Sequence, residues 1–245
     1  LKLEVASPSK SPQKRSWSKM HSFDTRDNRI VHGDMDNKGW RNLQIGEGEI
    51  LEGEAPSPTA VSILSLIHIS DLHICDAQSP ARLEVLDRLA DPHNPMSSIV
   101  KLVGTYRPNE ALTAQTLEAM VQTINQINHG PASNREIDAV VITGDVTDNA
   151  QANELDWYLT LMDGGEITPD SGDFSRWEGV GSSISSEYDC SYWTPDGAPQ
   201  GQEADYPREL YGFPLVEGLF DAVRKGFMAT GLRHKWRSEE HTSEL

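Results

Sequence analysis

The chain has 245 residues and a formal net charge of −17, with 24% charged and 37% hydrophobic residues. This composition is typical of a soluble globular protein with long loops, and the length suffices for one domain with tails. The acidic balance argues against general binding to nucleic acid, which needs a basic surface. No apolar run reaches the ~18 residues of a membrane span, and the 2 cysteines are too few for a disulfide scaffold.

The segment 1–60 is predicted to be disordered or loosely attached. Residues 7–12, Ser-Pro-Ser-Lys-Ser-Pro, have almost nothing apolar to bury. Residues 28–56 combine glycines with acidic residues, which indicates either a β-hairpin that leads to the first core strand or a linker. No Arg-Arg pair occurs in the chain, so export would require a signal upstream, and the localisation is left open.

A largely apolar run from Val61 to Ile69 ends at the pair Asp71 and His73. Its length and its Ile and Leu content predict a strand that is buried on both faces of a parallel sheet. Sites in such sheets lie beyond the carboxyl ends of the strands, where residues two apart point the same way. We therefore expect the carboxylate and the imidazole to share one cation, and this pair of ligands suits Zn, Mn or Fe better than Ca.

A second apolar run, residues 137–143, leads directly into Gly144, Asp145 and Asp148. It predicts another buried strand of the same parallel sheet, with Gly144 allowing a tight turn at its end. Either motif alone is a common strand-to-loop turn. Because both occur in this order and both follow strands, the sequence predicts that Asp71, His73 and Asp145 share one metal pocket.

Asp71-x-His73 and Gly144-Asp145-x-x-Asp148 resemble the opening motifs of the calcineurin-like metallophosphoesterases. The resemblance covers most of positions 61–236 and is closest to a bacterial branch with long inserts between the motifs. It implies an α/β fold, namely the parallel-stranded sheet core of a four-layer metallophosphoesterase domain. The implied inserts span residues 74–109 and 166–214.

The resemblance also implies roles for single residues. Asp71 and His73 would bind a first metal ion, Asp145 would bridge it to a second, and Asp148 would orient the catalytic His of the family. The intact enzymes hold two divalent or trivalent ions, for which Mn, Fe and Zn are the candidates. They hydrolyse phosphate mono- or diesters by metal-activated hydroxide, so a small-molecule or nucleotide phosphate ester is the implied substrate.

Later motifs of that family, Gly-Asn-His-Asp/Glu and Gly-His-x-His, do not occur in this sequence. Residues 232–236 would lead into the strand that carries the first of them. We therefore expect an N-terminal portion of the domain, incomplete at its C-terminus, with little or no turnover and without the His that Asp148 would orient. Residues 237–245 match a translated sequencing adapter residue for residue and are expected to be an artefactual tail.

Two helices are expected between the predicted strands. The first begins with Ser79 as N-cap and Pro80 at its first position. It is ended by the dipeptides Asp-Pro at 91–92 and Asn-Pro at 94–95. The second opens at residues 108–109 and stops at 130–131. The apolar side chains expected on their inner faces are Leu83, Leu86 and Leu89 in the first helix and Leu117, Met120, Val121, Ile124 and Ile127 in the second.

A third helix is expected directly after Asp145. Asp148 and Gln151 are spaced as in a capping box, so Asp148 either caps this helix or orients a catalytic His, and the two roles are compatible. Gly164 and Gly165 end the helix. Its expected buried residues are Leu155, Tyr158, Leu159 and Met162.

Residues 166–214 form a long segment that is rich in Gly, Ser, Trp and Tyr. Loops of this length are usually functional lids or disordered. The aromatic residues favour either an ordered cover that stacks on a substrate ring near the metal site or simple packing against the sheet. A last helix is expected over residues 216–229.

Several other residues allow more than one interpretation. Cys75 is either an additional metal ligand or a packed thiol. His68 lies within the first predicted strand and is interpreted as a core residue. A calcium-binding EF-hand loop starting at Asp145 is excluded, because Ala150 and Asp156 stand where Gly and Glu are required.

Two further functions stay open. One is a one-metal phosphotransfer domain in which the carboxylate of Asp71 is the nucleophile, and a trapped acyl-phosphate on Asp71 would favour it. The other is a non-catalytic exported binding module, for which the acidic composition and the aromatic segment are the support. Failure to bind any transition metal would favour the binding module.

Overall fold

The computed structural model describes residues 28–35, 41–47, 61–79, 84–91, 94–100, 106–131 and 133–239. The chain divides into a first unit, Leu1–Ser65 with Asn128–Ile137, and a second unit, Leu66–Ile127 with Asp138–Leu245.

In the first unit, strands β1 (Asn28–Met35) and β2 (Arg41–Glu47) pair antiparallel. Of the two alternatives for residues 28–56, the structure therefore has the β-hairpin. Apart from the hairpin, the segment 1–60 that is predicted to be loosely attached lies outside the described residues.

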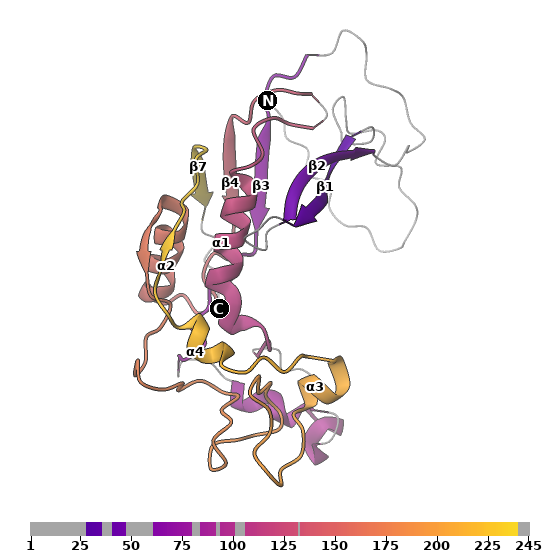
Figure 1. Cartoon of the computed structure of the whole chain (residues 1–245), viewed down its shortest axis with the longest axis vertical. Coiled ribbons are helices and arrows are strands. Elements are labelled where there is room, and N and C mark those ends of the chain that lie inside the picture. The colour runs from indigo at the N-terminus through magenta and orange to yellow at the C-terminus, as the bar shows by residue number, and fades with distance from the viewer. Residues whose placement is uncertain are drawn as a thin grey trace. The chain divides into compact units, whose positions relative to one another are not determined.

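The second unit contains a parallel three-stranded sheet in the order β3-β4-β7 (Figure 1). Its strands are β3 (Leu66–Ser70), β4 (Ala139–Thr143) and β7 (Trp236–Glu239). The α/β class with a parallel sheet is thereby confirmed. The carboxyl ends of β3 and β4 lie at the same edge, because these two strands pair in register from Leu66 with Ala139 to Ser70 with Thr143.

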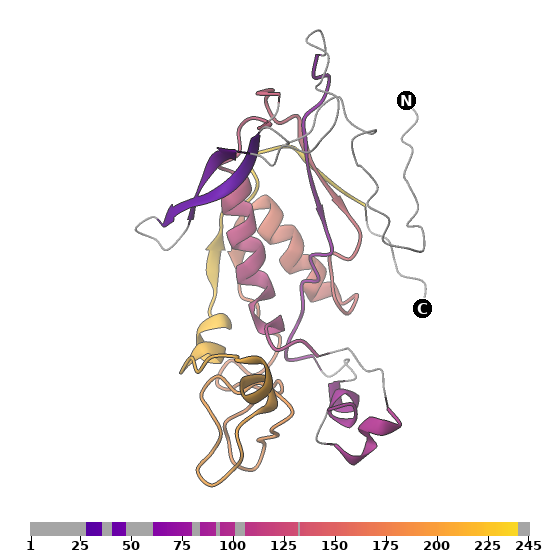
Figure 2. The same cartoon turned by 90° about the vertical axis from the view of Figure 1, so that its right-hand side faces the viewer.

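Helices α1 (Thr113–Ile124) and α2 (Ala152–Asp163) lie on the same side of this sheet (Figure 2). A short 3-10 helix, η4 (Glu110–Leu112), leads into α1 and confirms a helix that opens near residue 109. The α1 helix ends at Ile124 and not at residues 130–131. The buried core joins the helices to the strands through Ile69, Leu117, Val121, Ile124, Val140, Ile142, Tyr158, Leu161 and Met162.

The prediction for the buried face of α2 is only partly correct. Tyr158 and Met162 are buried, but Leu155 and Leu159 are 42% and 40% exposed, and Leu161 is buried instead. A helix buries a stripe that repeats every three to four residues, and the stripe of α2 passes through 154, 158, 161 and 162.

Strand β3 is not buried on both faces, contrary to prediction. Ile69 is its buried residue, whereas Leu66 is 46% exposed. His68 is exposed, and its Nε2 atom lies 2.6 Å from the Oγ1 of Thr143 in a hydrogen bond, so the core interpretation of His68 is wrong. Among the described residues the helices cover one side of the sheet, and the alternate side chains of β3 therefore face outward.

The first insert contains two short 3-10 helices, η2 (Glu84–Leu89) and η3 (Pro95–Ser98). Residues 80–83, the predicted start of a helix, lie outside the described residues. Leu86 is 41% exposed rather than on an inner face. Asn94 does not end a helix; its side chain caps η3 by accepting a backbone hydrogen bond.

The predicted helix over residues 216–229 is also wrong as a single element. The structure has α4 (Leu219–Val223) followed by strand β6 (Phe227–Ala229), which pairs antiparallel with β5 (Gly165–Ile167). Gly226 lies between the two elements, and a Cβ atom there would meet the Oγ1 of Thr168 at 2.8 Å. Glycine also disfavours continuation of a helix by ~1 kcal/mol relative to alanine.

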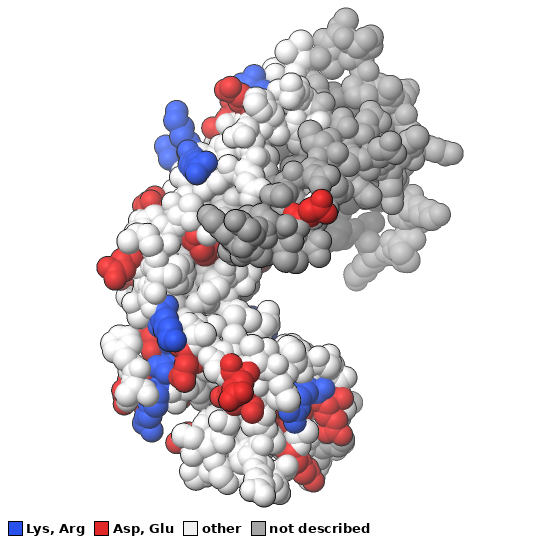
Figure 3. Space-filling view, in the orientation of Figure 1, with Lys and Arg blue, Asp and Glu red and all other residues white. Residues whose placement is uncertain are grey.

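The segment 166–214 contains one helix, α3 (Tyr206–Tyr211). Its aromatic side chains contact Phe220 of α4, Phe213 of the same segment and Tyr106 of the first insert. The rings of Trp177 and Phe220 stack with centroids 4.1 Å apart, and Trp193 is 3% exposed. Acidic and basic side chains are intermixed over the visible face of the second unit (Figure 3).

Strand β7 includes three residues of the predicted artefactual tail. Its first residue, Trp236, packs edge to face on Tyr158 with ring centroids 6.0 Å apart and donates its Nε1–H to Asp163. The remaining residues pair with β4 through their backbones, and their side chains are exposed. Backbone pairing is largely independent of side-chain identity, and the adapter origin of residues 237–245 stays a prediction.

None of the helices in the described part of the chain combines the length and the apolar character needed to cross a bilayer.

Candidate metal centre

The loops that follow β3 and β4 continue side by side beyond the sheet. The backbone N–H of Asp71 donates to the carbonyl of Gly144 at 3.3 Å, and that of His73 donates to the carbonyl of Asp145 at 2.8 Å. The N–H of Ile74 then donates to Val146 at 2.9 Å. These bonds hold the two polar loops together although they are more than 70 residues apart in sequence.

Asp71, His73 and Asp145 come together at this edge and are called the Asp-His-Asp cluster below. Each offers one ligand atom, and these atoms all lie within 4.8 Å of one another. Asp71 is exposed, while His73 and Asp145 are half-buried. Two carboxylates and an imidazole at such spacing fit a divalent cation of the Zn, Mn or Fe type, and solvent has access for further ligands.

All three members of the cluster have left-handed backbone conformations. Their φ angles are +58° for Asp71, +47° for His73 and +50° for Asp145. This region costs a residue with a side chain roughly 1–2 kcal/mol. Such strain gathers at functional sites, where the surrounding structure compensates for it. The concentration of strain at the cluster is therefore a second observation, besides the ligand types, that favours a functional role.

The imidazole of His73 lies between two carboxylates. Its Nε2 atom is 3.9 Å from the Oδ2 of Asp145, and its Nδ1 atom is 3.2 Å from the Oδ1 of Asp148. The Nδ1 atom is buried without a hydrogen bond of good geometry among the described residues. A histidine that binds a metal through one ring nitrogen usually directs the other toward a carboxylate. Asp148 occupies that second position.

Asp148 does not cap helix α2, so that alternative is wrong. The N-cap is Gln151, which forms a capping box with Glu154. In the structure the carboxylate of Asp148 lies 3.2 Å from the imidazole of His73, whereas the resemblance implies that it orients a separate catalytic His. Asp148 also accepts a short hydrogen bond from the guanidinium of Arg107.

A buried carboxylate supports the loop that carries Asp148. Glu154 is fully buried and accepts hydrogen bonds of 2.8 Å from the backbone N–H of Asp76 and from both the N–H and the Nδ2 of Asn149. Asp76 in turn accepts from the Nδ2 of Asn153 at 2.7 Å. This network fastens the loops after β3 and β4 to the first turn of α2. The spacing of Gln151 and Glu154 is a capping-box signal that identifies Glu154 in the sequence.

Arg107, to which the sequence analysis assigns no role, is held by its neighbours. Its backbone N–H donates to the Oε2 of Glu110 at 3.1 Å, and its carbonyl accepts from the N–H of Glu110 at 2.9 Å. The preceding residue, Tyr106, accepts a hydrogen bond from the N–H of Trp193 at 2.9 Å. Residues 104–108 belong to the stretches that carry the family resemblance, but nothing in their sequence indicates that Arg107 contacts Asp148.

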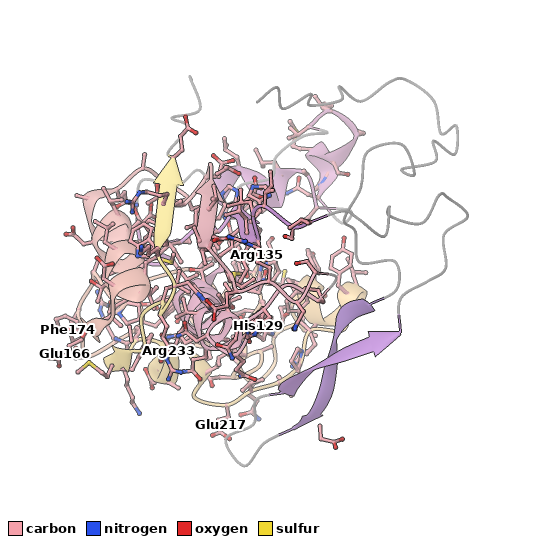
Figure 4. The ribbon with its side chains drawn as sticks, turned by 90° about the horizontal axis from the view of Figure 1, so that it is seen from above. His129, Arg135, Glu166, Phe174, Glu217 and Arg233 are labelled. Carbon is pink, nitrogen blue, oxygen red and sulfur yellow. The ribbon has the colours of Figure 1, made fainter. Side chains whose placement is uncertain are left out.

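The remaining metal-ligand candidates lie elsewhere. Cys75 is 6% exposed, and its Sγ lies 3.9 Å from the Nδ2 of Asn149 in a weak hydrogen bond, outside the Asp-His-Asp cluster. These surroundings favour the packed thiol. His129 belongs to the first unit, where it forms a backbone bridge with Glu136 (Figure 4).

Comparisons with known proteins found no match. None of the protein-family models, curated proteins or solved structures that were compared matches this chain. The interpretation of the site therefore rests on its own residues and geometry.

Proposed function

We propose that this chain carries the first-metal site of a metal-dependent phosphoesterase, built from Asp71, His73 and Asp145. The observation that supports this most is the position of His73, whose Nε2 faces the cluster while Nδ1 faces the carboxylate of Asp148. The ends of two adjacent parallel strands supply all these groups, which is the usual location of sites in parallel sheets.

In this proposal Asp148, Asp71 and Asp145 have different roles in metal binding. Asp148 favours the imidazole tautomer with the proton on Nδ1, which leaves the lone pair of Nε2 for a cation. Asp71 and Asp145 contribute anionic oxygen ligands. When bound, the cation would supply Lewis-acid polarisation of a phosphoryl oxygen and would lower the pKa of water at the site.

The bridging role of Asp145 and the second metal ion belong to the same proposal through the resemblance in motifs. The side chain of Asp145 is 43% exposed, so its carboxylate is open to solvent as a bridging ligand requires. The motifs that supply further ligands in that family do not occur in this sequence. We therefore expect metal binding by this chain, with turnover of phosphate esters close to background.

Titration of the full chain with Mn²⁺, followed by electron paramagnetic resonance of the free ion, tests the proposal. We expect Asp71→Asn and His73→Gln each to weaken binding by about tenfold or more, since each removes a ligand. The matched controls are His68→Gln and Asp156→Asn, which change an exposed histidine of β3 and an exposed aspartate of α2.

Three results would count against the proposal. Absence of binding for Mn²⁺, Fe²⁺ and Zn²⁺ would remove the metal site and favour the binding module. An equal loss in the control variants would show non-specific binding to acidic groups. A phosphorylated Asp71, trapped with acetyl phosphate, would favour the phosphotransfer domain.

A further inference from the structure

The guanidinium of Arg107 is linked to the Asp-His-Asp cluster through Asp148. It pairs with Asp148, whose carboxylate lies 3.2 Å from the Nδ1 of His73. His73 in turn lies 3.9 Å from Asp145. A continuous series of contacts therefore places one positive group next to a site that is otherwise built from carboxylates and an imidazole.

Within the part of the chain that the structure describes, most of the donor capacity of Arg107 is not used. One of its terminal nitrogens donates to Asp148, and among the described residues no other acceptor receives a hydrogen bond from the guanidinium. The side chain is 41% exposed. A guanidinium carries its N–H donors in a planar fork, so the edge that does not face Asp148 is open to a ligand.

The backbone at Arg107 is held from both sides. Glu110, which is 3% exposed, is tied to the N–H and the carbonyl of Arg107 by two hydrogen bonds. Tyr106 is fixed by the N–H of Trp193 and by an edge-to-face contact with Tyr192, at a centroid distance of 5.0 Å. The aromatic segment thus helps to position Arg107, and a ligand that binds the guanidinium pays little conformational entropy.

The charge of the metal-loaded cluster also favours a positively charged side chain at the substrate-binding site. The carboxylates of Asp71 and Asp145 together balance one divalent ion, so a cluster that holds a single ion offers little net charge to an anion. A phosphate ester is anionic, and the fork of an arginine matches two phosphate oxygens in geometry and in charge.

We propose that Arg107 binds the non-bridging oxygens of the phosphate group of a substrate held at the Asp-His-Asp cluster. This inference rests on the proposed function and extends it by naming the substrate-binding residue. In this arrangement the Oδ1 atom of Asp148 contacts both the Nδ1 of His73 and the guanidinium of Arg107. Asp148 thereby sets the metal ligand and the phosphate-binding residue in a fixed relation.

The test is binding of inorganic phosphate to the Mn²⁺-loaded full chain, measured by calorimetry in the wild type and in Arg107→Gln. The matched control is Arg88→Gln, because Arg88 is 47% exposed and pairs with Asp189 at 3.2 Å. We expect phosphate affinity to fall about 10- to 100-fold in Arg107→Gln and to be unchanged in the control. Mn²⁺ affinity, measured separately, should change by less than about threefold in both variants.

Two additional measurements keep the outcome decisive if Arg107→Gln folds poorly. Arg107→Lys keeps the charge without the fork and should show an intermediate phosphate affinity. In the wild type, phosphate with Mn²⁺ should slow modification of Arg107 by phenylglyoxal, read by mass spectrometry, and should leave Arg88 unaffected. Equal phosphate affinity in wild type and Arg107→Gln, or no protection of Arg107, would overturn the inference. Loss of Mn²⁺ binding in the wild type would instead refute the proposed function.

Discussion

The Nδ1 atom of His73 lies 3.2 Å from the Oδ1 atom of Asp148, and the side chain of Asp148 is only 9% exposed. A carboxylate with so little solvent contact interacts with its neighbours more strongly than an exposed one. The Nε2 atom of the same ring lies 3.9 Å from the Oδ2 of Asp145, so the imidazole stands between the two carboxylates. The geometry of the cluster therefore depends on a residue that is not itself a member of it.

Asp148→Asn should weaken Mn²⁺ binding by about 10- to 100-fold, which is the usual effect of removing the carboxylate behind a metal-binding histidine. The fold should be retained, because asparagine has nearly the same shape. The control is Asp189→Asn, since Asp189 also pairs with an arginine but is not paired with a residue of the cluster. Mn²⁺ titrations of both variants check this, and equal affinities would show that Asp148 has no role in orienting His73.

Glu154→Gln should destabilise the protein by about 2–3 kcal/mol. The buried carboxylate accepts three hydrogen bonds of 2.8 Å from Asp76 and Asn149, and the amide of Gln would turn an N–H₂ group toward at least one of these donors. Urea unfolding measures the change in the free energy of unfolding. Glu217→Gln is the control, because Glu217 is exposed (Figure 4) and should change stability by less than about 0.5 kcal/mol. A similar loss in both variants would contradict the support that the network is inferred to give.

The positions of the cluster residues followed from the sequence because they depend on local periodicity. An apolar run that stops at polar residues indicates a strand end, and two such ends in a parallel sheet fall at one edge. Asp71, His73 and Asp145 come together for this reason. The contact between Arg107 and Asp148, in contrast, joins residues 41 positions apart through irregular loops. No periodicity encodes such a contact.

The errors in the predicted fold have a similar origin. The run from Val61 to Ile69 has the composition of a fully buried strand, but burial depends on which elements cover each face of the sheet, and composition alone does not specify them. The helix predicted over residues 216–229 has helical spacing of its apolar residues. The pairing of Phe227–Ala229 with β5 outweighs that local preference, with Gly226 at the break.

Asp205 should give the protein a pH-dependent loss of stability. Asp205 is fully buried and caps α3 by accepting the N–H of Arg208 at 2.9 Å, while its Oδ2 atom has no hydrogen-bond partner among the described residues. Burial raises the pKa of Asp205 above its ordinary value of 3.8, against the opposing effect of the hydrogen bond from Arg208. The folded state therefore holds this proton more tightly, and the associated stability is full below pH 3.8 and lost as the pH rises through the raised pKa.

Asp205→Asn keeps an N-cap and removes the titration. The free energy of unfolding of the variant, relative to wild type, should increase between pH 3.8 and the raised pKa and then become constant. Asp173→Asn should show the opposite pH dependence of stability, because hydrogen bonds from Ser175 lower the pKa of Asp173. The stability that Asp173 contributes is present above its ordinary pKa and is lost as the pH falls. Urea unfolding over this pH range measures the free energy of unfolding of both variants. Parallel pH profiles for the two variants would contradict the assignment of the pH dependence to Asp205.

Asp71→Gly should be more stable than Asp71→Ala by about 1–2 kcal/mol, because residue 71 has a φ of +58° and alanine is strained there whereas glycine is not. Both variants lack the carboxylate and should bind Mn²⁺ equally weakly, so the comparison isolates the backbone. The control position is Asp156 within helix α2. There the order of stability should be reversed, with Asp156→Gly less stable than Asp156→Ala by about 1 kcal/mol. Thermal and urea unfolding of the four variants measure both differences. If glycine and alanine were equal at position 71, the strain at the cluster would be absent in solution, and the backbone would give no support to a functional role for this edge of the sheet.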